Sequence, residues 1–444
     1  MLLIKNGTVI DPKSGMEKEA HVLIDGEKIR LITENLEHCE EIRKIDPNLI
    51  QEIDADGLIV APGLVDVHSH FRDPGQTHKE TIHTGAKAAA AGGYTSIVMM
   101  ANTVPTVDTA ETLDYIKEKT AKERIHIYPC ATVSHGMEGK ELVDMTALKE
   151  AGAVGFTDDG KPLVDESLLK EAFQRCAELQ VPISLHEEDP KYVHQAGVNA
   201  GEVAKELGLE GAERKAEYTL VERDVALSKD SKVHLDIQHI SAKETVDILR
   251  RALKEDEAAG IERHIHGEAT PHHFSSTEDL VRRKDTLAKV NPPIRTEEDR
   301  QAIIKGLQDG TLDLIATDHA PHSTEEKKQE FTKAPSGMIG LETALPLAIT
   351  NLVKPGHLTL MQVLEKMTIN PAKLYGLDAG YLAEGGPADL VIFDPRVMRT
   401  IDRFASKSEN SPYRGATLYG EVVFTIAKGE IVYVKSITQG KWSD

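Results

Sequence analysis

The chain has 444 residues of ordinary globular composition, and this length predicts one large domain with a smaller one rather than a single small core. Its formal net charge of -21, from 52 basic and 73 acidic residues, disfavours nucleic acid and membranes as partners, and no apolar run approaches the roughly 18 residues of a membrane helix. The three cysteines, Cys39, Cys130 and Cys176, form no CxxC pair, and with the lack of a signal-peptide pattern they predict a cytoplasmic protein without a disulfide framework.

Short strands with tight turns are expected at both ends of the chain. Near the N-terminus, LLIKNGTVID (2–11) contains an Asn-Gly pair and HVLIDGEKIRLI (21–32) an Asp-Gly pair, and both pairs are hairpin signals. Near the C-terminus lie two similar runs, ADLVIFD (388–394) and GEVVFTIAKGEIVYV (420–434). Because each piece alone is short for an independent core, we expect the two ends to pair in one small β domain.

The middle of the chain alternates apolar, strand-like runs with helical patterns. The strand-like runs are GLVDVHSH (63–70), YTSIVMMAN (94–102), RIHIYPCATV (124–133), AVGFTDD (153–159), VPISLHEE (181–188), VHLDIQHIS (233–241), HIHGEATPHH (264–273) and LDLIATDHAPH (312–322). Helical periodicity lies between them, as in 78–93, 165–180 and 242–260. This alternation predicts an α/β fold with a (β/α)8 TIM-like barrel. A doubly wound open sheet is the alternative, but it needs a Gly-rich phosphate loop that we do not find.

Side chains that could bind a metal follow several of these runs. They are His68 and His70, Asp158 and Asp159, His186, His239, and Asp318 with His322. In a barrel the carboxyl ends of the strands meet at one mouth, where active sites are built. Alternate residues of a strand share a face, so His68, His70 and Arg72 would point the same way. Histidine and carboxylate ligands suit Zn²⁺ or a similar divalent ion, and a guanidinium beside them suits an anionic ligand.

Each of these residues alone also has an ordinary structural interpretation. An aspartate such as Asp318 is typical of a helix cap or a turn, and a lone arginine such as Arg72 is typically solvated. We assign a structural or supporting role to His272 and His273. The metal site is favoured because candidate ligands end five of the eight predicted strands. Spacing alone leaves open which of Asp158 and Asp159 would bind the metal.

Seven motifs resemble the amidohydrolase superfamily, and they look most like the bacterial dihydroorotases of class I. In chain order they are PGLVDVHSHFRDPG, ANTVP, GFTDDG, SLHEE, QHIS, NPPIR and IATDHAPH. The DxHxHxR pattern in the first marks only the superfamily. FTDDG, NPPIR and DHAPH in combination are much more specific, and the resemblance runs from the first residues to about residue 440.

The resemblance implies both a fold and an activity. The fold would be a (β/α)8 barrel over residues 61–370, flanked by a small β-sandwich built from residues 1–60 and 371–444. The activity would be that of a zinc-dependent cyclic amide hydrolase. It would interconvert (S)-dihydroorotate and N-carbamoyl-L-aspartate in de novo pyrimidine synthesis, through a metal-activated hydroxide. One or two Zn²⁺ per subunit would be bound, with two expected. A homodimer and an association with aspartate transcarbamoylase are further expectations at the family level.

The resemblance also implies a role for each matched residue. The implied metal ligands are His68, His70, Asp159, His186, His239 and Asp318. The first two would hold one zinc together with Asp318, which would also move protons as the catalytic residue. His186 and His239 would hold the second zinc, and Asp159 would bridge the two ions. The implied substrate-binding residues are Arg72, Asn102, Asn291, His322, Ser336 and Gly337.

Two positions depart from the family pattern. Ala101 precedes Asn102 where the family usually has proline, and Ser336 precedes Gly337 where an aromatic residue is common. Packing around the substrate ring therefore stays open. One alternative is a hydantoinase or allantoinase, but those relatives bridge their metals with a carboxylated lysine on the fourth strand, where this chain has FTDDG. The other is an inactive dihydroorotase-like scaffold, which would usually lack the metal ligands that this chain keeps.

Overall fold

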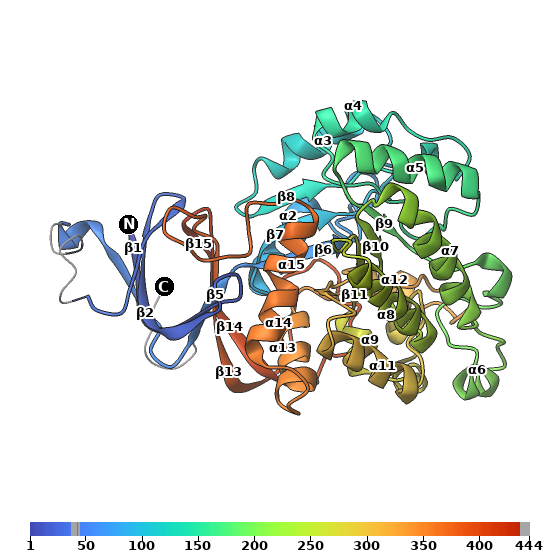
Figure 1. Cartoon of the computed structure of the whole chain (residues 1–444). Coiled ribbons are helices and arrows are strands. Elements are labelled where there is room, and N and C mark those ends of the chain that lie inside the picture. The colour runs from blue at the N-terminus through green and yellow to red at the C-terminus, as the bar shows by residue number, and fades with distance from the viewer. Residues whose placement is uncertain (37–41, 43–44, 436–444) are drawn as a thin grey trace.

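The computed structural model describes residues 1–36, 42 and 45–435. A β-rich unit that contains strands from both ends of the chain lies beside a larger body of helices and short strands (Figure 1). Cys130 and Cys176 are buried and unpaired, while Cys39 falls outside the described residues. Within the described ranges, no helix has the length and apolar character needed to span a membrane.

Strands from the two chain ends share one mixed sheet. Its members are β1 (Leu2–Asp11), β2 (Met16–Asp25), β3 (Lys28–Thr33), β4 (Gln51–Asp54), β5 (Ile59–Pro62), β13 (Leu390–Thr400), β14 (Thr417–Ala427) and β15 (Glu430–Val434). They are ordered β15-β14-β13-β5-β1-β2-β3, and β4 also pairs with β1. The join is made by β5, which runs parallel to β1 and antiparallel to β13. The expected pairing of the two ends is therefore present.

The two predicted turns in the N-terminal segment have different outcomes. The Asp-Gly turn is confirmed, because β2 and β3 form an antiparallel hairpin that reverses after Asp25. The Asn-Gly turn is wrong, because β1 continues through Asn6 and Gly7 with only a shift in its register to β2. A Cβ atom at Gly7 would lie 2.5 Å from Cγ2 of Val60 on β5. Glycine is needed there for close packing rather than for a chain reversal.

The end sheet has an apolar core of its own, in which Ile392 on β13 is fully buried and pairs with Val60 on β5. We expect Ile392→Ala to lower the free energy of unfolding by about 2–5 kcal/mol, because it leaves a cavity where the two chain ends join. Met398 lies on the same strand with 55 % of its surface exposed, so Met398→Ala should cost under about 0.5 kcal/mol. Urea unfolding followed by circular dichroism measures both, and equal effects would contradict the packing described.

The described part of the body contains seven short parallel strands. They are β6 (Leu64–Ser69), β7 (Tyr94–Met99), β8 (His126–Pro129), β9 (Ile183–Leu185), β10 (Leu235–Ile237), β11 (Ile265–Ala269) and β12 (Leu314–Ile315). They pair as β6-β7-β8 and as β12-β11-β10-β9. Single parallel bridges from Phe156 to Ala131 and to Ile183 connect the first sheet with the second. A further parallel bridge joins Ser69 to His319, beyond β12.

The predicted strand over residues 153–159 is therefore reduced to the bridging residue Phe156. The next part of that run is held by a side chain instead of by strand pairing. The carboxylate of Asp158 accepts hydrogen bonds from the backbone N–H groups of Val133 at 2.8 Å and Ser134 at 3.2 Å. These two amides therefore donate to a carboxylate instead of to a backbone carbonyl of the run 153–159.

Helices follow the strands and cover the outside of the body (Figure 1). They are α2 (Ile82–Ala91), α3 (Ala110–Thr120), α4 (Met145–Ala151), α5 (Glu166–Leu179), α6 (Glu202–Glu206), α7 (Lys215–Ser231), α8 (Lys243–Ala258), α9 (Pro271–Ser275), α10 (Asp279–Lys284), α11 (Glu297–Gln308), α12 (Thr324–Lys327), α13 (Ala344–Ala348), α14 (Leu360–Met367) and α15 (Ile369–Leu374). Shorter turns are η1 (Pro47–Leu49), η2 (His135–Met137), η3 (Pro190–Tyr192), η4 (Asp285–Ala288) and η5 (Ile349–Val353). The helices predicted at 78–93, 165–180 and 242–260 are found as α2, α5 and α8.

Candidate metal centre and substrate pocket

Every residue that the sequence assigned to the site lies at or just beyond the carboxyl end of a body strand or on a loop beside these ends. A pocket of about 190 Å³ lies there. Its lining includes His70, Arg72, Asn102, Asp159, His186, His239, Asn291, Asp318, His322, Ser336 and Gly337. The remaining predicted residue, His68, is fully buried directly beneath them. Arg72 and His322, which are 250 positions apart in the sequence, are thus brought together.

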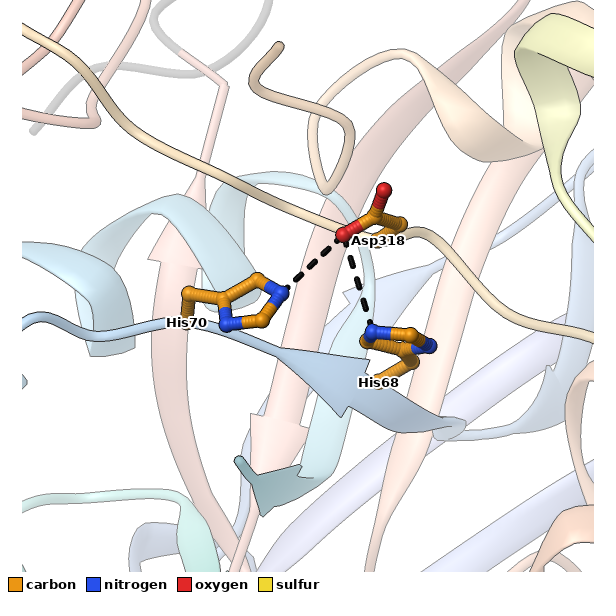
Figure 2. Close-up of side chains that lie close together, drawn as sticks. All are labelled: His68, His70 and Asp318. Atoms are coloured by element: carbon orange, nitrogen blue, oxygen red, sulfur yellow. Dashed lines mark hydrogen bonds and ion pairs between the residues drawn. The ribbon is translucent and has the colours of Figure 1, made fainter. Parts of the chain in front are cut away.

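His68, His70 and Asp318 form the first group that could hold a metal ion. Figure 2 shows the two rings rising from β6 towards the carboxylate, whose Oδ1 lies 3.0 Å from Nε2 of His70 and 3.6 Å from Nε2 of His68. Nε2 of His68 is buried and has no hydrogen-bond partner in the described part of the chain. A buried nitrogen aimed at a carboxylate and a second imidazole has the chemistry of a divalent-metal ligand.

Asp159 belongs to the second such group, with His68 and His239. Its Oδ1 lies 3.5 Å from Nε2 of His68 and 3.8 Å from Nε2 of His239, and its Oδ2 lies 3.5 Å from Nε2 of His70. One carboxylate thus faces ligands of both groups with its two oxygens. Asp158 instead points to the backbone that follows β8, so Asp159 is the member of the pair that faces the site.

His186 lies beside the second group rather than within it. Its Nδ1 is 2.8 Å from Nε2 of His239 and 3.6 Å from Oδ1 of Asp159, and its Nε2 is 3.2 Å from a carboxylate oxygen of Glu188. Burial disfavours the charged ring, but the hydrogen bonds to Asp159 and Glu188 raise the pKa of His186 to about 10. His186 and His239, which were predicted to share one metal ion, lie next to each other in space. In the group that contains Asp159 and His239, however, the third member is His68, where His186 was expected.

The site keeps its two inward-facing carboxylates ionised. Burial opposes the charge of Asp159, but His68 and His186 hold the pKa of that carboxyl well below its usual range. Burial likewise opposes the charge of Asp318, and the hydrogen bond from His70 with the nearby imidazoles lowers the pKa of that carboxyl. Two buried carboxylates facing several imidazole nitrogens make a concentrated, negatively charged donor set for a cation.

Glu268 on β11 is a functional residue that sequence reasoning missed. Its Oε2 lies 2.8 Å from Nδ1 of His68 and accepts the backbone N–H of His239 at 3.1 Å. The carboxylate fixes the proton of His68 on Nδ1 and so leaves Nε2 free to coordinate. In the same way, Nδ1 of His70 lies 2.9 Å from Oδ1 of Asn102. The available signal was an acidic residue in the middle of the strand-like run HIHGEATPHH.

Three site residues have a backbone conformation that residues other than glycine rarely adopt. The φ angles are +59° at Arg72, +32° at His239 and +47° at Asp318. Non-glycine residues in this left-handed region are uncommon and are concentrated at functional sites, where the surrounding structure holds them. Each of the three follows a body strand by a few residues. The sharp turn there aims the side chain at the pocket instead of along the strand.

Two cationic side chains flank His322 of the pocket. Nε of Arg72 donates to the carbonyl of Pro321 at 3.2 Å, and a terminal guanidinium nitrogen lies 3.5 Å from Nε2 of His322. The ammonium of Lys79, which sequence reasoning also missed, lies 3.3 Å from Nδ1 of the same ring. Burial together with these two cations holds the pKa of His322 far below its usual value. The ring is therefore neutral, and Arg72 supplies a fixed positive charge beside the carboxylates.

Comparison with known families agrees with this geometry. Residues 59–432 match the model of the Amidohydrolase family. The chain belongs to the amidohydrolase family. The relatives include the dihydroorotase of Clostridioides difficile (strain 630), with 53% identity over 98% of this chain and 100% of the relative. The dihydroorotase of Clostridium acetobutylicum is 52% identical over 98% of this chain and 99% of the relative.

Solved structures place the amidohydrolase body among TIM-barrel-like folds. The L-hydantoinase (dihydropyrimidinase) from Arthrobacter aurescens aligns with a TM-score of 0.85 at 25% identity, covering 99% of this chain and 97% of that one. The dihydropyrimidinase from Brevibacillus agri aligns with a TM-score of 0.81 at 25% identity, covering 97% and 94%. The parallel strands and outer helices of this amidohydrolase fit that TIM-barrel-like arrangement.

Because the structural neighbours include hydantoinases, it matters whether this amidohydrolase has a lysine in its pocket that could be carboxylated. Among the described residues that line the pocket, none is a lysine. Asp159, three residues after Phe156, faces both ligand groups with its carboxylate.

At the two departures from the family pattern, the neighbouring residues make defined contacts within the site. Ala101 is fully buried, and the amide of Asn102 that follows donates to Oδ2 of Asp159 at 3.0 Å. The carbonyl of Ser336 lies 2.8 Å from Nε2 of His322. Gly337 has a φ of +130°, and a Cβ there would lie 3.0 Å from Nε2 of His322, so the position requires glycine.

Proposed function

We propose that this protein is a dihydroorotase, which interconverts (S)-dihydroorotate and N-carbamoyl-L-aspartate in pyrimidine synthesis. The observation that carries the proposal is a pocket in which Arg72 lies beside two buried carboxylates and several imidazoles, in a chain 53% identical over nearly its whole length to a curated dihydroorotase. The substrate ring carries a carboxylate, and a guanidinium is the side chain best suited to bind one.

The metal is zinc, with two ions in each subunit. His68, His70 and Asp318 would hold one ion, His186 and His239 would hold the other, and Asp159 would be shared between them. The ionised carboxylates and the free Nε2 of His68 support this assignment. A bound zinc ion lowers the pKa of water to about 7 and polarises a carbonyl group, which makes hydrolysis of a cyclic amide feasible at neutral pH.

Asp318 is the catalytic residue. Its environment keeps it ionised, so it can accept the proton of the attacking water and then donate that proton to the ring nitrogen that leaves. In the reverse reaction the same carboxylate accepts the amide proton. Arg72 binds the substrate carboxylate, and the remaining pocket residues orient the ring. These are Asn102, Asn291, His322, Ser336 and Gly337.

The proposed architecture is a closed (β/α)8 barrel over residues 61–370 with a β-sandwich made of residues 1–60 and 371–444. The parallel bridges at Phe156 and between Ser69 and His319 support closure, and the shared sheet of the two chain ends supports the second unit. A homodimer, an association with aspartate transcarbamoylase and a cytoplasmic location stay predictions.

An ultraviolet assay of dihydroorotate consumption, combined with metal analysis of the same sample, tests the proposed function. We expect turnover of dihydroorotate that is lost with a chelator and restored by added zinc. Hydantoin and allantoin serve as comparison substrates and should be turned over far more slowly. Preference for either of them would favour a hydantoinase or allantoinase, and a metal-loaded protein inactive on all three would favour a scaffold.

Arg72→Met should lower kcat/KM for dihydroorotate by about ten- to a hundred-fold, because a charge-assisted contact to a carboxylate is worth about 1.5–3 kcal/mol. Metal content should not change, because the guanidinium contacts Pro321 and His322 rather than a predicted ligand. The matched control is Arg124→Met, which removes an exposed arginine paired with Glu430. Kinetics of Arg72→Met equal to those of this control would reject the proposed carboxylate contact.

A further inference from the structure

The segment between β13 and β14 returns from the end sheet to the pocket of the body. Asn410 in this segment is 3 % exposed, and its side-chain amide is fully engaged. Oδ1 accepts the backbone N–H of His322 at 3.1 Å. Nδ2 donates to the carbonyls of Ala320 at 3.0 Å and Gly337 at 3.1 Å. One buried side chain thus makes three hydrogen bonds to two different loops.

Those two loops carry residues to which the proposed function assigns substrate binding. One runs beyond β12 through His322, and the other contains Ser336 and Gly337. They also touch directly, through the 2.8 Å contact of Nε2 of His322 with the Ser336 carbonyl. Asn410 does not itself line the pocket. Its amide joins the two loops from outside the pocket, next to the backbone hydrogen bond from Ala320 N–H to the Met338 carbonyl at 2.8 Å.

The three bonds require an asparagine. Two carbonyl oxygens need donors and one N–H needs an acceptor, and a primary amide offers that combination on one planar group. Aspartate has nearly the same shape but would bring a carboxylate against two carbonyl oxygens. Alanine would leave the His322 N–H and the Ala320 carbonyl without a partner at a buried position, while the Gly337 carbonyl would keep its bond from Lys327.

We propose that Asn410 is a positioning residue for the substrate, which fixes His322 and the Ser336–Gly337 backbone at their binding distance before the substrate arrives. The inference rests on the proposed dihydroorotase function and adds to it a residue from the segment assigned to the other domain. Preorganised loops bind their ligand without a further cost of ordering, so loss of the amide should weaken binding more than it slows the chemical step.

The test compares Asn410→Ala and Asn410→Asp with the wild type and with Glu409→Gln, which changes the exposed neighbour paired with Arg414. We expect KM for dihydroorotate to rise about tenfold or more in both Asn410 variants, with kcat within about threefold and metal content unchanged. Glu409→Gln should match the wild type. Unchanged KM in a folded Asn410 variant overturns the inference, and so does a loss of kcat that follows lost metal.

Amide hydrogen exchange in the wild type gives a second measurement that needs no variant. The His322 amide should exchange at least about a hundredfold more slowly than in an unstructured peptide, without any substrate, because Asn410 already binds it. Exchange at the unprotected rate overturns the inference even if both variants fail to fold. Failure of the proposed function looks different, because the wild type itself would then not turn over dihydroorotate.

Discussion

Asp318→Ala should abolish dihydroorotate turnover in both directions, with a loss of at least about a thousandfold. General acid–base catalysis alone contributes about 10²–10⁴-fold, and both directions use the same carboxylate. A further loss is expected because Asp318 lies 3.0 Å from Nε2 of His70, in the group that holds the first metal. No other carboxylate among the described lining residues is free for the proton transfer, because Asp159 faces the imidazoles of both groups.

Metal content must be measured with the rates, since the two losses have different causes. Asp318→Asn keeps the shape of the side chain and one coordinating oxygen but cannot accept the proton, so it should retain more metal than Asp318→Ala while staying inactive. The control is Asp378→Ala, an exposed aspartate that bonds to Tyr381. Substantial hydrolysis by a fully metallated Asp318→Ala protein would show that another group moves the proton.

Asp159→Asn should weaken metal binding by at least about a hundredfold and remove activity with it. The carboxylate faces ligands of both groups, and a neutral amide is a poorer ligand for a divalent cation. Loss of a residue that only hydrogen-bonds to a metal ligand typically lowers metal affinity by about 10–100-fold. Loss of a ligand itself should lower the affinity at least as much. Metal analysis after dialysis against a weak chelator measures the effect.

The neighbouring residue provides a matched control for this prediction. Asp158→Asn removes a charge at the adjacent position, but Asp158 bonds to the backbone of Val133 and Ser134 instead of facing the site. It should lower the melting temperature and leave metal content near that of the wild type. Equal metal loss in both variants would mean that the effect is one of local folding and not of ligation.

The same argument predicts that activity does not depend on dissolved carbon dioxide. A carboxylated lysine forms from carbon dioxide, whereas Asp159 needs no such reaction. Rates in degassed buffer and in bicarbonate-supplemented buffer should therefore agree. Activation by bicarbonate, or a carbamate found between the metals, would contradict the role of Asp159.

Local sequence patterns determined most of the framework. Apolar runs of strand length alternate with helical periodicity, and seven of the eight predicted body strands are present. The two-residue spacing of His68 on β6 and His70 directly after it was enough to place both rings on one face, where they meet Asp318 (Figure 2). These features could be predicted because they depend on the period of the backbone and on the rule that parallel strands end at a common edge.

The local signals failed where a distant segment changed their meaning. The Asn6–Gly7 pair reads as a hairpin turn, but the glycine serves the close approach of Val60 on another strand. The run at 153–159 reads as a strand, but only Phe156 forms parallel bridges, and the Asp158 side chain binds the backbone after β8. In both cases tertiary contacts outweighed a weak local preference.

The sequence by itself determined which residue types end the strands, and so the chemistry of the site. Only the tertiary structure decided which supporting groups hold them. Glu268 meets His68 across 200 residues, and Asn410 meets His322 across 88 residues. Neither pairing has a local signature, because a single buried carboxylate or amide obtains its role from the partners that folding brings within hydrogen-bond distance. The choice of Asp159 over Asp158 has the same cause, since adjacent residues point in different directions and only packing determines which one faces the metal ligands.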